Sequence, residues 1–360
     1  MMTHAARLTR CTLFAALVAF GTGCGSSGES KSDPVGGDGS GGSGGSTTSP
    51  TSAACDGAFT SIEAPYAPNT SIQDWGGFVA DEQGLVFSAL ADSTLDSYDA
   101  DLPSIMVAAD RSGNVQTIYS YPDTAMPGPI FAFGDDIYFV EGLLSRTIMK
   151  LPRAGGEATL VSDDGLRAGP VSDGAKLYYA ARPTLDSVIV ALDIESGETE
   201  TVAELGDVEV IAIAIDGDQL YFVTSADALS EEDSSLYSLP TSGGDAELVM
   251  QLPYDTALSS FRVVDEVGFG SAITEDFSIV INRIEFGETP IVVEDRGGMP
   301  MVIAGDKIYY NGFDGLVENS LDFDDPRVVS DGGGLGIYAI AVHDSSIWYA
   351  VRGCIYEAPR

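Results

Sequence analysis

Carboxylates are the residues of this sequence with the greatest capacity for chemistry. The chain carries 55 aspartates and glutamates against 17 lysines and arginines, which gives a formal net charge of -38. Carboxylate oxygens bind calcium and basic groups. One aspartate recurs in each of six connections between repeated units, at Asp123, Asp164, Asp207, Asp255, Asp295 and Asp331. This pattern predicts an acidic binding face, whereas turn formation and solubility explain the same aspartates without any ligand.

Residues for other kinds of catalysis are scarce. Once a predicted signal segment is removed, His343 is the only histidine, and the sequence has no G-x-S-x-G, P-loop or C-x-x-C pattern. A Ser-His-Asp triad or a histidine-rich metal centre therefore has little to draw on. We expect a non-enzymatic binding protein for a protein, a glycan or a cation. The alternative is a carbohydrate- or lactone-acting hydrolase or lyase that uses a carboxylate pair.

The charge balance also bears on partners and cofactors. A surface of net charge -38 repels phosphate backbones and anionic headgroups, so the sequence predicts no nucleic-acid binding and no peripheral membrane binding. No cofactor is expected, with calcium as the open alternative. We expect the folded part to be a monomer.

The N-terminal region has the composition of an export signal. Residues 1–23 combine Arg7 and Arg10 with a short apolar stretch, and they end in small residues before Cys24. Residues 24–54 are rich in Gly and Ser and have almost no large apolar side chains, which predicts a flexible tether. We expect Cys24 to be lipidated and to hold the protein in the cell envelope, at the outer membrane or cell surface rather than the inner membrane. Simple secretion is the alternative.

The elements that would position the aspartates come from a repeat in residues 55–360. An apolar-x-aromatic step recurs at spacings of 39 to 52 residues. Its third residues are Phe87, Phe139, Tyr179, Phe222, Phe269, Tyr310 and Tyr349. Short strands repeated at such periods are typical of β-propeller blades. One unit is predicted as four strands, at residues 210–215, 220–225, 235–240 and 247–252. The fold is predicted as all-β, a propeller of seven four-stranded blades, with six or eight blades as alternatives.

The ends of the repeat region predict how the ring closes. The last repeat lacks a fourth strand, and residues 58–64 are expected to supply it from the start of the domain. Cys55 and Cys354 lie near the two ends and are expected to form a disulfide. A simple hairpin register between the two end strands would separate these cysteines, and the sequence leaves that objection open.

Residues 55–360 as a whole resemble the broad group of exported bacterial β-propellers, including the TolB-like and YVTN-repeat types. The sequence lacks the YWTD tetrapeptide, the WD40 Gly-His and Trp-Asp pair and the aligned Kelch double glycine. The resemblance therefore implies the propeller fold and assigns no functional residue.

Overall fold

The structure is a computed structural model of the chain. It describes residues 60–61, 67–68, 77–90, 104–122, 127–142, 146–225, 234–252, 258–273, 279–294, 298–330, 337, 339–351 and 354–360. By its contacts the chain divides into two units, Met1–Asp56 and Gly57–Arg360, and all described residues belong to the second. Nowhere in these ranges is there a helix of the length and apolarity needed to cross a membrane.

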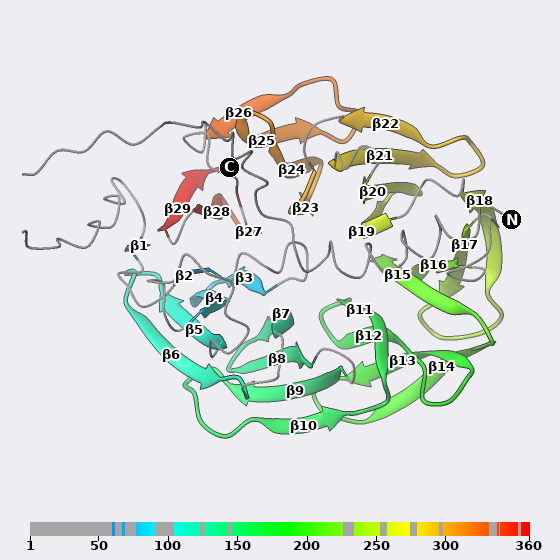
Figure 1. Cartoon of the computed structure of the whole chain (residues 1–360), viewed down its shortest axis with the longest axis horizontal. Helices are drawn as coiled ribbons and strands as arrows, with labels where there is room; N and C mark the ends of the chain where they lie inside the picture. The colour runs from blue at the N-terminus through cyan, green and yellow to red at the C-terminus, as the bar shows by residue number, and fades with distance from the viewer. Residues whose placement is uncertain are drawn as a thin grey trace, which may run out of the picture. The chain divides into compact units, whose positions relative to one another are not determined.

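Seven antiparallel sheets form the second unit, and each is one blade of a propeller (Figure 1). Blade one contains β3 (Phe78–Asp81), β4 (Gly84–Leu90), β5 (Ser104–Asp110) and β6 (Val115–Ser120), with β2 (Ala67–Pro68) also paired to β4. Blade two contains β7 (Pro127–Phe133), β8 (Asp136–Glu141), β9 (Thr147–Pro152) and β10 (Thr159–Ser162). Blade three contains β11 (Leu166–Ser172), β12 (Lys176–Ala181), β13 (Ser187–Asp193) and β14 (Thr199–Gly206).

The remaining four blades have the same order. Blade four contains β15 (Glu209–Asp216), β16 (Gln219–Ser225), β17 (Ser234–Pro240) and β18 (Glu247–Leu252). Blade five contains β19 (Leu258–Val264), β20 (Val267–Ile273), β21 (Ile279–Glu285) and β22 (Ile291–Glu294). Blade six contains β23 (Met301–Ala304), β24 (Lys307–Gly312), β25 (Gly315–Ser320) and β26 (Arg327–Ser330). Blade seven contains β27 (Ala339–His343), β28 (Ser346–Val351), β29 (Cys354–Pro359) and β1 (Thr60–Ser61). The prediction of seven blades is confirmed.

Tight turns join the first and second strands of the blades. Between β19 and β20 only Asp265 and Glu266 intervene, and both have positive φ, at 50° and 62°. A two-residue hairpin with positive φ at both positions matches the right-handed twist of its strands, and aspartate tolerates this conformation better than most residues. Local turn chemistry therefore sets the register of each blade.

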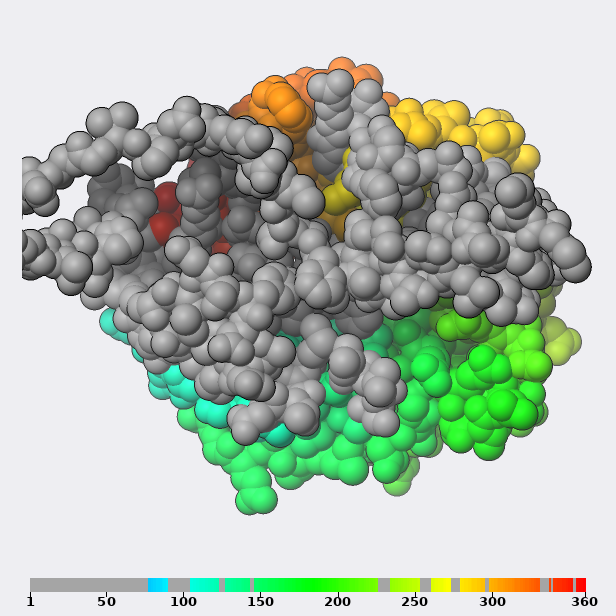
Figure 2. Space-filling view, viewed as in Figure 1, coloured from blue at the N-terminus to red at the C-terminus, as the bar shows by residue number. Residues whose placement is uncertain are grey.

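The recurring aromatic residues pack between blades, as predicted. All seven are buried, with exposures between 0% and 7%. Phe139 of β8 lies in one cluster with Val86 of β4 and Met106 of β5, so blade two packs directly on blade one. In Figure 2 the colours run around the body from cyan through green and yellow to orange, so blades that follow each other in sequence are also neighbours in space. Each blade buries its faces against its neighbours.

The ring is closed by the N-terminal strand. In β1, Thr60 pairs with Ile355 and Ser61 with Cys354, so the start of the domain completes blade seven. The Arg111 guanidinium of blade one also lies 5.0 Å from the centre of the Trp348 ring of blade seven. Cys354 begins β29 and is 7% exposed, whereas Cys55 and Cys24 lie outside the described residues. The Cys55–Cys354 disulfide stays a prediction.

Candidate functional site

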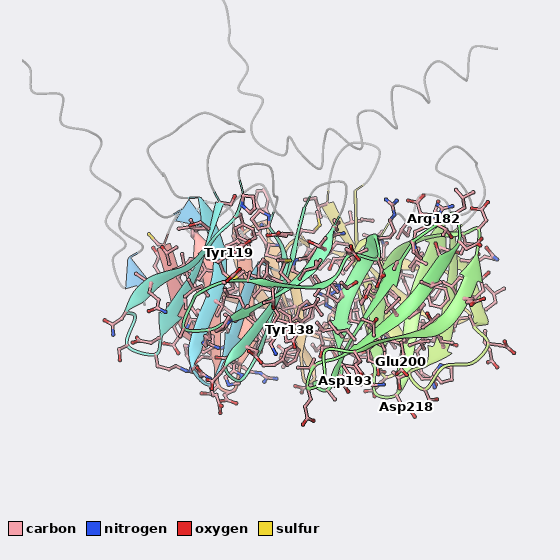
Figure 3. The ribbon with its side chains drawn as sticks, turned by 90° about the horizontal axis from the view of Figure 1, so that it is seen from below. Tyr119, Tyr138, Arg182, Asp193, Glu200 and Asp218 are labelled. Atoms are coloured by element: carbon pink, nitrogen blue, oxygen red, sulfur yellow. The ribbon has the colours of Figure 1, made fainter. Side chains whose placement is uncertain are left out.

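Two of the six predicted aspartates can be placed. Asp164 lies between β10 and β11, and Asp207 lies between β14 and β15. These connections share a face with the loops between second and third strands, such as the loop that begins at Arg182. Figure 3 shows Arg182 on this face, whereas Asp193 and Asp218 lie on the opposite face. The other four aspartates, Asp123, Asp255, Asp295 and Asp331, lie outside the described residues.

Asp164 binds groups of its own blade. Its Oδ2 accepts hydrogen bonds from Ser162 Oγ at 2.9 Å and from the Tyr179 hydroxyl at 3.2 Å. Burial raises the pKa of the Tyr179 phenol, and the nearby charge of Asp164 raises it further. Asp164 therefore stabilises the end of β10 and a buried tyrosine, which is the structural interpretation of this aspartate.

Asp207 forms an ion pair with Arg182, which lies on the same face. The Arg182 Nη2 atom lies 2.6 Å from Asp207 Oδ1, and the Asp207 side chain is 80% exposed. No group of three His, Cys, Asp or Glu side chains suited to a metal ion occurs in the part of the chain that the structure describes. The cation site on the acidic face stays a prediction.

His343 also contacts a neighbouring residue of its own turn. It ends β27, and its Nε2 lies 3.2 Å from Asp344 Oδ2 in the turn that leads to β28. That turn lies on the face opposite the aspartate connections, because it joins a first strand to a second strand.

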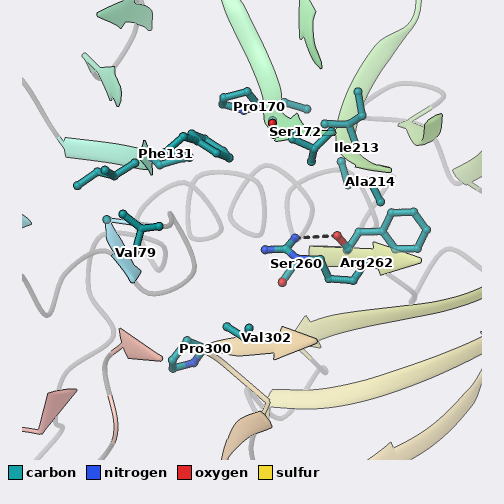
Figure 4. A pocket seen from close by; sticks show the side chains of 18 of the residues that line it. Val79, Phe131, Pro170, Ser172, Ile213, Ala214, Ser260, Arg262, Pro300 and Val302 are labelled. Atoms are coloured by element: carbon teal, nitrogen blue, oxygen red, sulfur yellow. Dashed lines mark hydrogen bonds between the residues drawn. The ribbon is translucent and has the colours of Figure 1, made fainter. Parts of the chain in front are cut away.

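A central channel runs between the inner strands of the described propeller. Its volume is about 500 Å³, and its lining includes residues from all seven inner strands, β3, β7, β11, β15, β19, β23 and β27. Most of the lining is apolar, as Figure 4 shows for Val79, Phe131 and Ile213. Pockets of about 300–1,000 Å³ with a few polar groups are the usual form of a small-molecule site.

The described residues of the channel lining have a charge opposite to that of the whole chain. Among its described residues the lining includes Arg146, Arg167 and Arg262 and no Asp, Glu, His or Cys. The full sequence has about three acidic residues for each basic one. A cationic lining inside so acidic a protein points to an anionic ligand group.

Arg146 and Arg167 lie together at blades two and three. Arg146 directly precedes β9, and its Nη1 donates to the backbone oxygen of Arg167 in β11 at 3.4 Å. Burial lowers the pKa of Arg146 to about 10, so its guanidinium is still charged at neutral pH. These two arginines form the cationic part of the lining at that side of the channel.

Ser260 and Arg262 form a second polar group on blade five. Both belong to β19 and are two residues apart, so their side chains point to the same side of the strand. Figure 4 shows both directed toward the channel, and Arg262 Nη1 donates to the Phe261 oxygen at 2.8 Å. Ser260 Oγ is buried and has no hydrogen-bond partner within the described part of the chain. A buried hydroxyl without a partner needs a physical explanation, and a ligand in the channel would supply one.

Ser172 provides the contrast within the same lining. Its hydroxyl donates to the Lys176 backbone oxygen at 3.0 Å and accepts from the Gly174 backbone N–H at 2.9 Å. Ser172 therefore serves the turn between β11 and β12. The structure, and not the residue type, shows that Ser172 has hydrogen-bond partners whereas Ser260 has none among the described residues.

Sequence reasoning did not identify the channel arginines. Arg167 and Arg262 are the only charged residues of two inner strands, "LRAGPVS" and "LSSFRVV". A charged residue within such a strand was the available signal. That signal was weaker than the repeated aspartates, because a strand by itself does not show which of its edges lines a channel.

Three solved structures show how this chain compares with known proteins, and two of them have TM-scores above 0.5. The acylaminoacyl peptidase of Pyrococcus horikoshii matches with a TM-score of 0.53 and 14% identity over 80% of this chain and 52% of that chain. The virginiamycin B lyase of Staphylococcus aureus matches with a TM-score of 0.51 and 11% identity over 79% of this chain and 94% of that chain. TolB of Acinetobacter baumannii matches with a TM-score of 0.40 and 12% identity over 76% of this chain and 79% of that chain.

These values define the class of protein and nothing finer. The chain is a seven-bladed β-propeller, and identities of 11% to 14% show a shared fold alone. The TolB score is too low to support a specific relation to TolB. No protein-family model matches the chain, and no curated protein matches it.

Proposed function

We propose that this protein is a non-enzymatic binding propeller of the cell envelope that holds its ligand in the central channel. The observation that carries this proposal is the lining of the channel. It combines about 500 Å³ of mostly apolar space with three arginines and a buried serine hydroxyl that has no partner among the described residues. Such a lining suits the capture of a small or extended ligand.

The same lining favours binding over hydrolysis. A glycosidase-type mechanism needs two carboxyl groups at the reacting bond, and general acid–base catalysis needs a group that titrates near neutral pH. The described lining contributes arginines and serines and no carboxylate or imidazole. The arginines can bind and orient a ligand, and they remain charged throughout.

The proposed location of the protein is the cell envelope, as the sequence predicts. Residues 1–23 would direct export, Cys24 would carry the lipid, and residues 24–54 would tether the propeller. A tether of about 30 residues spans roughly 30 Å as a flexible chain. The acidic loop face would remain available to a protein, a glycan or a cation while the channel holds its own ligand.

A neutral apolar fluorophore tests whether the channel binds ligands. N-phenyl-1-naphthylamine should bind the exported protein with increased fluorescence, and Ile211→Trp should weaken this binding at least about tenfold. Ile211 lines the channel and is 37% exposed, so the larger indole would fill the space. Leu160→Trp is the matched control, because Leu160 is 57% exposed on β10 and is not among the lining residues. Absence of binding, or equal binding to both variants, would refute the proposal.

A further inference from the structure

We propose that the channel ligand is an amphipathic anion whose oxyanion is bound by Ser260 Oγ and Arg262, with Arg146 and Arg167 supplying further positive charge. This inference rests on the proposed function, because it names the chemical class of the ligand for the same channel.

Ser260 indicates the kind of atom that the ligand presents. A serine hydroxyl can donate or accept a hydrogen bond. Ser260 is 6% exposed as a residue, and its hydroxyl has no partner in the described chain. Arg262, two residues away on the same side of β19, carries only donors. A ligand cation beside Arg262 would be repelled. An oxygen that accepts from both residues would give the Ser260 hydroxyl a partner and would lie beside the positive charge of Arg262.

The charge distribution indicates that this oxygen is anionic. The protein as a whole repels anions, because its formal net charge is -38. An anion is therefore held only where local cations outweigh that field, and the lining includes three arginines from blades two, three and five. Guanidinium groups bind carboxylates and phosphates through paired hydrogen bonds in one plane.

The rest of the lining indicates that the anion has an apolar body. An oxyanion group fills a small part of about 500 Å³. The remaining described lining is dominated by apolar side chains, including Phe78, Val79, Ile130, Phe131, Ile213 and Met301. Burying a hydrocarbon body against this surface is favourable, because it removes apolar area from water. Carboxylate and phosphate headgroups share the required chemistry.

Three probes with closely similar alkyl chains separate the headgroup from the body. Octanoate, octyl phosphate and 1-octanol should each displace N-phenyl-1-naphthylamine from the exported protein. The two anions should do so at concentrations at least about tenfold lower than the neutral alcohol. Such an advantage for either anion supports the proposal, and the better of the two identifies the headgroup. Equal potency of all three probes would overturn the anion inference while leaving a neutral channel ligand in place.

Two variants test the residues directly. Arg262→Gln and Ser260→Ala should each weaken octanoate binding about tenfold or more, because each removes a hydrogen bond to a charged group. Binding of 1-octanol should stay within about twofold. Arg327→Gln is the charge-matched control, since Arg327 lies on β26, where it pairs with Glu318. If Arg327→Gln weakens octanoate as much as Arg262→Gln does, the net charge is responsible and the assignment to Ser260 and Arg262 fails.

The melting temperature of the ligand-free protein distinguishes a ligand-binding serine from a serine that only supports the fold. Ser260→Ala should leave the melting temperature unchanged or raise it, because the hydroxyl has no described partner to lose. Ser172→Ala should lower the melting temperature, because that hydroxyl bonds Lys176 and Gly174. A marked loss of stability in Ser260→Ala would show that its hydroxyl serves the fold, and it would overturn the role given to Ser260. If N-phenyl-1-naphthylamine does not bind at all, the proposed function itself fails.

Discussion

At the scale of single residues, the aspartates of the connections differ in what they contribute to stability. Asp164→Ala should cost about 1 kcal/mol, because Asp164 accepts from Ser162 and from the buried Tyr179. Asp207→Ala should cost less, in the range of about 0–1 kcal/mol, because its pair with Arg182 is exposed to solvent. Urea unfolding of the two variants and the parent measures both differences. A larger loss in Asp207→Ala would contradict this ranking.

At the scale of elements, buried aromatic residues of the second strands pack against the neighbouring blades. Phe139→Ala should lower the free energy of unfolding by about 3–5 kcal/mol, because Phe139 is 1% exposed between blades one and two. Leu160→Ala, on the outer strand of the same blade, should change it by less than about 0.5 kcal/mol. Thermal or urea unfolding compares them. Equal effects would show that the aromatic does not carry the contact between blades.

Ring closure by β1 leads to a covalent prediction at the scale of the whole molecule. β1 and β29 pair at Ser61 and Cys354, which joins the two ends of the propeller. Non-reducing peptide mapping of the exported protein should recover Cys55 linked to Cys354. In the chain-entropy treatment, a loop of this length contributes roughly 5 kcal/mol, so reduction should lower the melting temperature. Two free thiols in the exported protein would remove this disulfide.

The anchor is the second prediction at this scale. Cys24→Ser should release the protein from the membrane fraction into the soluble fraction, because no lipid could then be attached. The propeller should melt at the same temperature in both forms, since the predicted tether separates it from the anchor. Fractionation with detergent partitioning measures the first effect, and calorimetry measures the second. Retention of Cys24→Ser in the membrane would contradict the lipoprotein prediction.

The sequence by itself determined the blades, because their information is local. An apolar-x-aromatic strand, a short turn rich in Asp and Gly and a regular period are each contained within a few tens of residues. The incomplete last repeat likewise indicated that the start of the domain completes blade seven, and β1 confirms it. The repeated aspartates were visible for the same reason, since they belong to the turn chemistry of each unit.

Only the tertiary structure decided which residues line the channel. Arg167 and Arg262 belong to inner strands two blades apart, and ring closure is what brings both into one lining. The sequence "LSSFRVV" does not show that the Ser260 hydroxyl lacks a described partner, or that Ser172 in "LRAGPVS" has two. The composition of the lining depends on which strand edge faces the axis and on how the blades are placed around it. Such proximity between distant segments leaves no periodic trace in the chain.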